Sequence, residues 1–99
     1  MIVATPPAHV QVVAREFSFA LSRRTIRAGR VVVELVNHGE DAHDLQLRRV
    51  GATRAVRFAT VQPGEHADRE LRLRRGRYVL TCTVANHAAV GMRAVLTVR

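Results

Sequence analysis

The sequence predicts an all-β protein, a Greek-key β-sandwich of seven to eight strands. Along most of the chain, apolar and polar residues alternate with a period of two, as in strands that bury one face. Turn-forming pairs such as Ala28-Gly29, Pro63-Gly64 and Arg75-Gly76 separate these runs. With 99 residues, 47% hydrophobic and 24% charged, the chain has the size and composition of one folded domain, which excludes a disordered protein.

Each expected strand has its own pattern, and no segment predicts a helix. In the run 43–48, for example, His43 shares one face with Leu45 and Leu47, while the other face is polar. By the same alternation Cys82 and Met92 lie on the apolar faces of their runs. Residues 1–9 are expected to form an extended N-terminal arm, and residues 10–99 to form the folded domain. We expect strands at residues 10–14, 17–21, 30–36, 43–48, 68–74, 77–82 and 92–98, with 54–61 either a strand or an irregular crossover.

The net charge of +8 is carried entirely by arginine, because the sequence has no lysine. This charge favours an acidic partner or an anionic surface. The arginines are scattered and aromatic residues make up 4% of the chain, so nucleic-acid binding is not expected. No apolar run approaches the ~20 residues of a membrane-spanning helix. The single cysteine excludes an internal disulfide framework and a paired-cysteine zinc module.

Three potential metal ligands follow one another near the C-terminus with the spacing C-x4-H-x4-M. They are Cys82 at the end of one expected strand, His87 in the connecting loop and Met92 at the start of the next strand. His43 begins an earlier strand, after the predicted turn 37–42. If these strand ends meet at one pole of the sandwich, two imidazoles, a thiolate and a thioether converge, and these donors suit copper.

Each of these residues by itself also has a simpler interpretation. A lone cysteine or methionine on an apolar face is commonly a core residue, and a lone histidine there is commonly satisfied by a hydrogen bond. The joint spacing and the shared inward face favour copper ligation over core packing. His9, His38 and His66 are expected at the surface. Tyr78 is expected in the core, with its hydroxyl group capping a corner of the sandwich.

From about Val10 to Val98 the sequence resembles the cupredoxins, the small type 1 (blue) copper proteins. The resemblance implies a Greek-key sandwich that holds one copper ion through His43, Cys82, His87 and Met92 and carries single electrons. It rests on the copper-ligand spacing together with Phe17-Ser18-Phe19, the run 31–47, the turn 61–65 and the pattern Gly76-x-Tyr78-x-x-x-Cys82.

The chain departs from the family pattern at two places. The loop 83–86 has neither the Pro nor the Gly that family members often carry there. Asp44 stands where the family often has an Asn that ties the two ligand loops together. We expect Asp44 to retain this bond by accepting from Thr83, and its negative charge to lower the reduction potential of the copper.

The resemblance implies an electron carrier that is not an enzyme, because four protein ligands leave no open position for a substrate. Two alternatives remain, a copper chaperone or storage domain and a metal-free accessory sandwich. A redox protein partner is expected to dock near His87, where Ala88, Ala89 and Val90 are apolar. We further expect a monomer outside the cytoplasm, in the periplasm or at the cell surface, with the export signal absent from this chain because it was trimmed.

Overall fold

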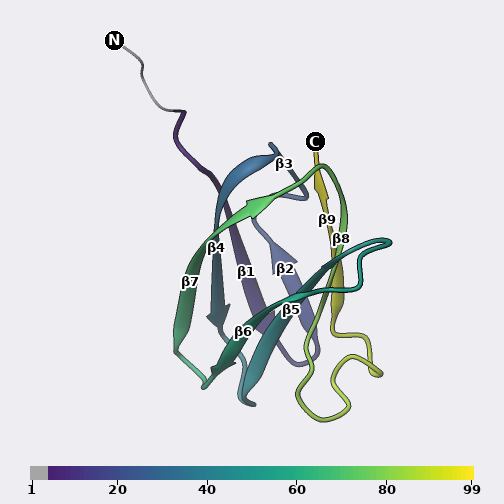
Figure 1. Ribbon diagram of the computed structural model, residues 1–99. Coiled ribbons are helices and arrows are strands. Elements are labelled where there is room, and N and C mark those ends of the chain that lie inside the picture. Colours follow the sequence, from purple (N-terminus) through teal and green to yellow (C-terminus); the bar gives the residue numbers. More distant parts are fainter. Residues whose placement is uncertain (1–4) are drawn as a thin grey trace.

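The computed structural model describes residues 5–99 and shows an all-β sandwich (Figure 1). Nine strands occur in this part of the chain, and no helix does. In chain order they are β1 (Ala8–Arg15), β2 (Ser18–Leu21), β3 (Thr25–Ile26), β4 (Gly29–Asn37), β5 (His43–Arg49), β6 (Val56–Val61), β7 (His66–Leu73), β8 (Gly76–Thr81) and β9 (Arg93–Val98).

The strands form two mixed sheets. The four-stranded sheet has the order β2-β1-β4-β7, and the five-stranded sheet has the order β3-β9-β8-β5-β6. The β1/β4 and β3/β9 pairs are parallel, whereas the other neighbours are antiparallel. The chain crosses between the sheets after β2, β3, β4, β6 and β7, as the connections of a Greek-key sandwich do.

The core lies between the sheets and follows from the alternation in the sequence. In β4 every second residue from Val31 to Asn37 is buried, and β5 buries His43, Leu45 and Leu47. Branched aliphatic side chains from both sheets pack into one cluster. Burying such side chains stabilises the fold by roughly 1.5–3 kcal/mol each.

The predicted fold class is confirmed, with nine strands instead of seven to eight. The strand not expected from the sequence, β3, has only two residues, which pair with Thr97 and Val98 of β9. A two-residue strand has no readable period, so only its pairing reveals it. Residues 56–61 form strand β6, which decides between the two predicted alternatives. No helix among residues 5–99 is long and apolar enough to cross a membrane.

Some boundaries differ from those predicted. Strand β1 begins at Ala8, so two residues of the expected arm belong to the sheet, and residues 1–4 lie outside the described part of the chain. Strand β7 begins at His66 rather than at residue 68. The hydroxyl group of Tyr78 donates to the Arg74 carbonyl at 3.0 Å, which confirms the predicted corner.

One pole of the sandwich collects the connections β1–β2, β4–β5, β6–β7 and β8–β9 (Figure 1, lower end). These are residues 16–17, 38–42, 62–65 and 82–92. We call this end the site pole, because the predicted metal ligands lie there. The C-terminus and the connections β2–β3, β3–β4 and β7–β8 lie towards the opposite end, and the connection between β5 and β6 projects from the side (Figure 1).

Candidate metal centre

Three of the four predicted ligands form a buried cluster at the site pole. The Nδ1 atoms of His43 and His87 lie 3.9 Å and 3.6 Å from the Cys82 Sγ atom. His43 is 0% exposed, Cys82 1% and His87 6%. Both imidazoles therefore turn the same ring nitrogen towards one thiol in the interior, and the three ligand atoms lie within 4.8 Å of one another.

The β8–β9 connection supplies two members of this cluster. Cys82 follows the last residue of β8, and Met92 precedes the first residue of β9. Each therefore lies one residue outside the observed strand, whereas the predicted strands 77–82 and 92–98 included them. The Met92 N–H donates to the His87 carbonyl at 3.0 Å, and the Cys82 N–H donates to the Met92 carbonyl at 3.3 Å. These bonds close the loop, and they place the Met92 backbone beside those of both other residues. Met92 is fully buried at 0% exposure.

The thiol of Cys82 sits in surroundings that oppose its ionisation in the metal-free chain. Burial raises the pKa of the Cys82 thiol above its ordinary value, while N–H groups of Asp44 and Val84 act in the opposite direction. The Asp44 N–H points at Sγ from 3.5 Å. A bound cation stabilises a thiolate at such a place.

Asp44 ties the two ligand-bearing segments together, as the sequence predicts. Its carboxylate accepts from the Thr83 N–H at 2.6 Å and also from the Thr83 hydroxyl group. Since Asp44 follows His43 and Thr83 follows Cys82, the two bonds fix these ligands relative to each other. An aspartate thus performs the tie here that the family pattern assigns to asparagine.

The side chain of Asn37 holds the turn before His43 in place. The sequence predicted this turn but not the hydrogen bonds of Asn37. Its buried side-chain amide donates to the carbonyls of Asp41 at 2.9 Å and Val61 at 3.0 Å. Its Oδ1 atom accepts from the Gly39 N–H at 2.8 Å. The side chain therefore joins the turn to the end of β6.

Glu16 contacts the predicted ligand His43, and sequence reasoning missed this residue. The His43 Nε2 atom lies 2.9 Å from Glu16 Oε1, and the same carboxylate accepts from the backbone N–H groups of Glu40 and Asp41 at 2.7 Å. The pKa of the Glu16 carboxyl falls to about 2, chiefly because the Asp41 N–H donates to it, with Glu40 and His43 adding to this and burial opposing it. Glu16 and His43 are 27 residues apart in the chain, so no local sequence pattern predicts their contact.

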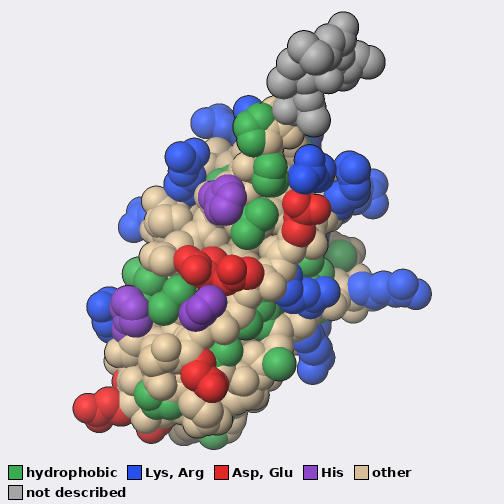
Figure 2. Space-filling view, turned by 90° about the vertical axis from the view of Figure 1, so that its left-hand side faces the viewer, with side chains coloured by type: hydrophobic (Ala, Val, Ile, Leu, Met, Phe, Trp, Pro, Cys, Tyr) green, Lys and Arg blue, Asp and Glu red, His purple; other side chains and the backbone are tan. Residues whose placement is uncertain are grey.

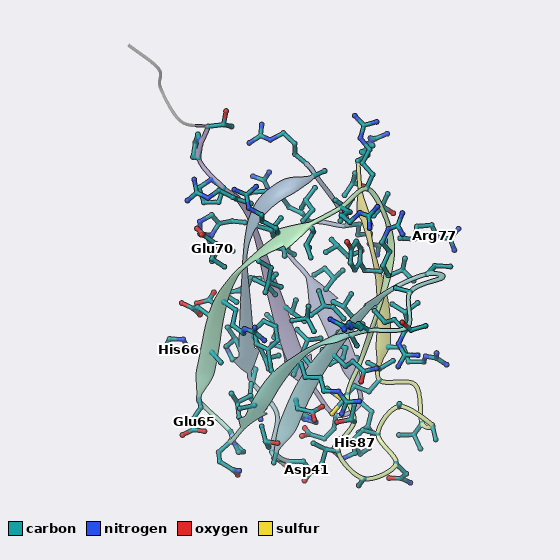
Figure 3. All side chains as sticks on the ribbon, viewed as in Figure 1. Asp41, Glu65, His66, Glu70, Arg77 and His87 are labelled. Carbon is teal, nitrogen blue, oxygen red and sulfur yellow. The ribbon has the colours of Figure 1, made fainter. Side chains whose placement is uncertain are left out.

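The outer side of His87 meets an aromatic ring and a carboxylate. The Phe17 ring lies 4.7 Å from the His87 ring, centroid to centroid, and Phe17 is 39% exposed. The Asp41 Oδ2 atom lies 3.8 Å from His87 Nε2. Figure 3 shows His87 and Asp41 together at this end of the molecule. The His87 ring is thus covered rather than open to solvent.

The remaining histidines lie at the surface, as expected. His9, His38 and His66 are all exposed. His66 forms a second cluster with Glu34 and Asp68 on the outer face of the four-stranded sheet. Its ring nitrogen is 3.4 Å from Asp68, and both side chains are more than half exposed. This second cluster has the character of an ordinary surface ion pair.

The donor set of the buried cluster fits copper. Two imidazoles and a thiolate beside a thioether are the donors of a type 1 copper site, since thiolate and thioether suit Cu(I) and imidazole suits either oxidation state. His43, Cys82 and His87 bring three of these donors together in the buried cluster, and Met92 is buried with its backbone bonded to those of Cys82 and His87. Among residues 5–99 no buried nitrogen or oxygen atom of a side chain is left without a hydrogen-bond partner. The polar groups around the cluster therefore all have partners within the protein.

Comparison with known proteins identifies the fold. No protein-family model matches the sequence, and no curated protein does. Among solved structures, an auracyanin from Roseiflexus castenholzii superposes with a TM-score of 0.76 at 17% identity, covering 96% of this chain and 99% of that one. Auracyanin A, a "blue" copper protein from Chloroflexus aurantiacus, gives 0.73 at 15% identity, with 95% and 100% covered. Reduced rusticyanin gives 0.66 at 22% identity, with 96% and 82% covered. Over nearly its whole length, therefore, the chain has the cupredoxin fold.

Proposed function

We propose that this protein binds one copper ion through His43, Cys82, His87 and Met92 and carries single electrons between redox partners. The observation that carries this proposal is the buried cluster in which both Nδ1 atoms face the Cys82 Sγ atom. When bound, the copper supplies a one-electron Cu(I)/Cu(II) couple.

The chain's own residues hold the donors still. Asp44 and Thr83 join the segments that carry His43 and Cys82. The backbone hydrogen bonds of Met92 to His87 and Cys82 hold the two ends of the β8–β9 connection together. A donor set that moves little when the oxidation state changes keeps the reorganisation energy low, which favours fast electron transfer. Four protein donors also leave no position for a substrate, so we infer a carrier and not an enzyme.

The same contacts favour a carrier over a copper chaperone or storage domain. A chaperone must expose its ligands to hand over the ion, whereas Cys82 is 1% exposed and Met92 is 0% exposed. A metal-free accessory domain is disfavoured, because such a domain has no use for two buried imidazoles that face one thiol.

Titration of the reduced metal-free protein with Cu(II) tests the proposal by visible absorption and electron paramagnetic resonance. We expect an intense thiolate-to-copper band and narrow copper hyperfine splitting that saturate at one equivalent. Cys82→Ser is expected to abolish both, while the surface variant His66→Ala keeps them. A weak, broad spectrum in the unchanged protein would refute the type 1 assignment.

We place the docking surface for the redox partner beside His87. Phe17 packs on the His87 ring, and the Val90 N–H donates to the His87 carbonyl at 3.2 Å. Phe17 is 39% exposed and Val90 51% exposed. A partner that covers these two apolar side chains comes close to His87 and also to the half-exposed carboxylate of Asp41, 3.8 Å from the His87 Nε2 atom. We further propose a monomer that works outside the cytoplasm, in the periplasm or at the cell surface.

The charges of the molecule are distributed unevenly between its two ends, although Arg15 and Arg93 directly flank the connections of the site pole. The connections of the site pole contain Glu16, Glu40, Asp41 and Glu65 and no arginine. Arginines crowd the other connections and the C-terminus, and the lowest part of the face in Figure 2 shows acidic side chains without blue ones. Those arginines are Arg23, Arg24, Arg27, Arg54, Arg74, Arg75 and Arg99.

An anionic surface or acidic partner is therefore expected to bind at the arginine-rich end, away from the site pole. The Debye length is about 10 Å at 0.1 M ionic strength, so a small molecule at the site pole responds mainly to the local carboxylates. We infer that the redox partner presents positive charge around its own docking face.

This charge distribution predicts the sign of a salt effect. Oxidation of the reduced protein by the cation tris(phenanthroline)cobalt(III) is expected to slow as ionic strength rises, because salt screens its attraction to the site pole. Oxidation by the anion hexacyanoferrate(III) is expected to accelerate. Stopped-flow absorbance measures both rates, and Glu40→Gln combined with Asp41→Asn is expected to weaken both dependences. The opposite signs would show that the net charge of +8 governs the encounter.

A further inference from the structure

We propose that Glu16 is a positioning residue of the copper centre, which orients His43 and lowers the reduction potential of the bound copper. The inference rests on the proposed function, because it concerns a ligand of that copper. It goes beyond the ligand set, since Glu16 lies outside the ligand motif, in a connection between two strands of the sheet that does not contain His43.

The position of the carboxylate follows from the pairing of strands. Glu16 is in the connection between β1 and β2, at the edge of the four-stranded sheet, whereas His43 begins β5 of the other sheet. Their contact of 2.9 Å therefore bridges the two layers at the site pole. His43 is completely buried, while the Glu16 side chain is 28% exposed, so the carboxylate closes the outer side of this imidazole.

The hydrogen bond determines which nitrogen of His43 is available to a metal. The Glu16 carboxylate already accepts from the backbone N–H groups of Glu40 and Asp41, and it has no proton of its own to offer in this arrangement. The His43 Nε2 atom must then carry the proton and donate. Its Nδ1 atom keeps a free lone pair and faces Cys82 at 3.9 Å.

A carboxylate that accepts from a ligating imidazole makes this ligand more basic and holds its ring orientation. The greater basicity and the added negative charge stabilise Cu(II) more than Cu(I). The expected consequence is a lower reduction potential than the same four donors give with a neutral acceptor at this place.

Gly39 leaves the room that the carboxylate occupies. A Cβ atom at position 39 would lie 2.8 Å from Glu16 Oε2 and 2.9 Å from Glu16 Cδ, which is closer than real contacts allow. The obstructing atoms are the end of a flexible side chain, so Gly39→Ala is expected to displace the carboxylate and leave the fold intact. This substitution therefore moves the negative charge of Glu16 without removing it.

The test compares reduction potentials measured by spectroelectrochemical titration of the copper-loaded protein. Glu16→Gln keeps a carbonyl oxygen that can accept from His43 but removes the charge. Gly39→Ala keeps the charge but moves it. For both we expect the preference for Cu(II) over Cu(I) to fall about tenfold, which for a one-electron couple raises the potential by about 59 mV.

Glu40→Gln is the matched control, because it removes one carboxylate from the same turn and no bond links the Glu40 side chain to His43 among the described contacts. Its shift is expected to be less than half that of Glu16→Gln. Equal shifts in the two variants would reduce Glu16 to a distant charge, and an unchanged potential in Gly39→Ala would exclude a role for the contact.

These outcomes are distinct from failure of the proposed function. If the unchanged protein shows no intense thiolate-to-copper band, the copper assignment fails before any variant is compared. Unfolding of the metal-free variants in denaturant provides the second readout. A purely structural role for Glu16 predicts lower stability in Glu16→Gln with an unchanged potential in the molecules that remain folded, and this result would overturn the proposal.

Discussion

Asn37→Ala is expected to lower the free energy of unfolding of the metal-free protein by about 3 kcal/mol. The substitution leaves the carbonyls of Asp41 and Val61 and the N–H of Gly39 without their partner. Asn37 is 0% exposed, so water cannot replace these bonds without opening the structure. Each polar group left unsatisfied in the interior costs roughly 1–3 kcal/mol.

Urea unfolding followed by circular dichroism measures this effect. Asn86→Ala is the matched control, because Asn86 is an exposed residue of the same type, and a surface change of this kind alters stability by about 0.5 kcal/mol or less. A loss in Asn37→Ala no larger than that in the control would show that the turn before His43 does not depend on the buried amide. Because the turn carries the residues that hold Glu16, we also expect broadened copper hyperfine lines in the loaded variant.

Copper loading is expected to raise the free energy of unfolding by about 4 kcal/mol when free copper is about 1,000 times Kd. The reason is linkage: the donors converge only in the folded chain, where His43 and Cys82 are brought together across 39 residues. Denaturant unfolding with and without copper measures the difference.

Cys82→Ala is expected to lose most of this stabilisation, since the thiolate is the strongest donor of the set. His66→Ala is expected to retain it, because His66 lies on the outer face of the four-stranded sheet. Equal stabilisation of the unchanged protein and Cys82→Ala would mean that copper binds elsewhere. Loss in His66→Ala would point to the surface cluster with Glu34 and Asp68.

The local features of the site are predictable from sequence because they obey strand periodicity. The alternation along β5 places His43 inward, and the intervals of five from Cys82 to His87 and Met92 span a single loop. The tie between Asp44 and Thr83 is also predictable, since each residue directly follows a predicted ligand. That Met92 serves as a ligand remains a proposal.

The surroundings of the site depend on long-range contacts that the alternation of polar and apolar residues does not predict. Glu16 reaches His43 from the edge of the other sheet, and Phe17 covers His87 from the same short connection. The net charge of +8 also does not describe the site pole, because its connections contain four carboxylates and none of the sixteen arginines, seven of which lie in the other connections or at the C-terminus.

The sequence by itself determined the all-β class, most of the strands and the three donors that the buried cluster brings together, because alternation and turn chemistry act between near neighbours. Only the tertiary structure decided that a carboxylate holds His43, that Asn37 anchors its turn and that the site pole is acidic. These features depend on which strands pair and which connections share an end of the sandwich. Such contacts join residues far apart in the chain, and their energies arise only when the two sheets pack together.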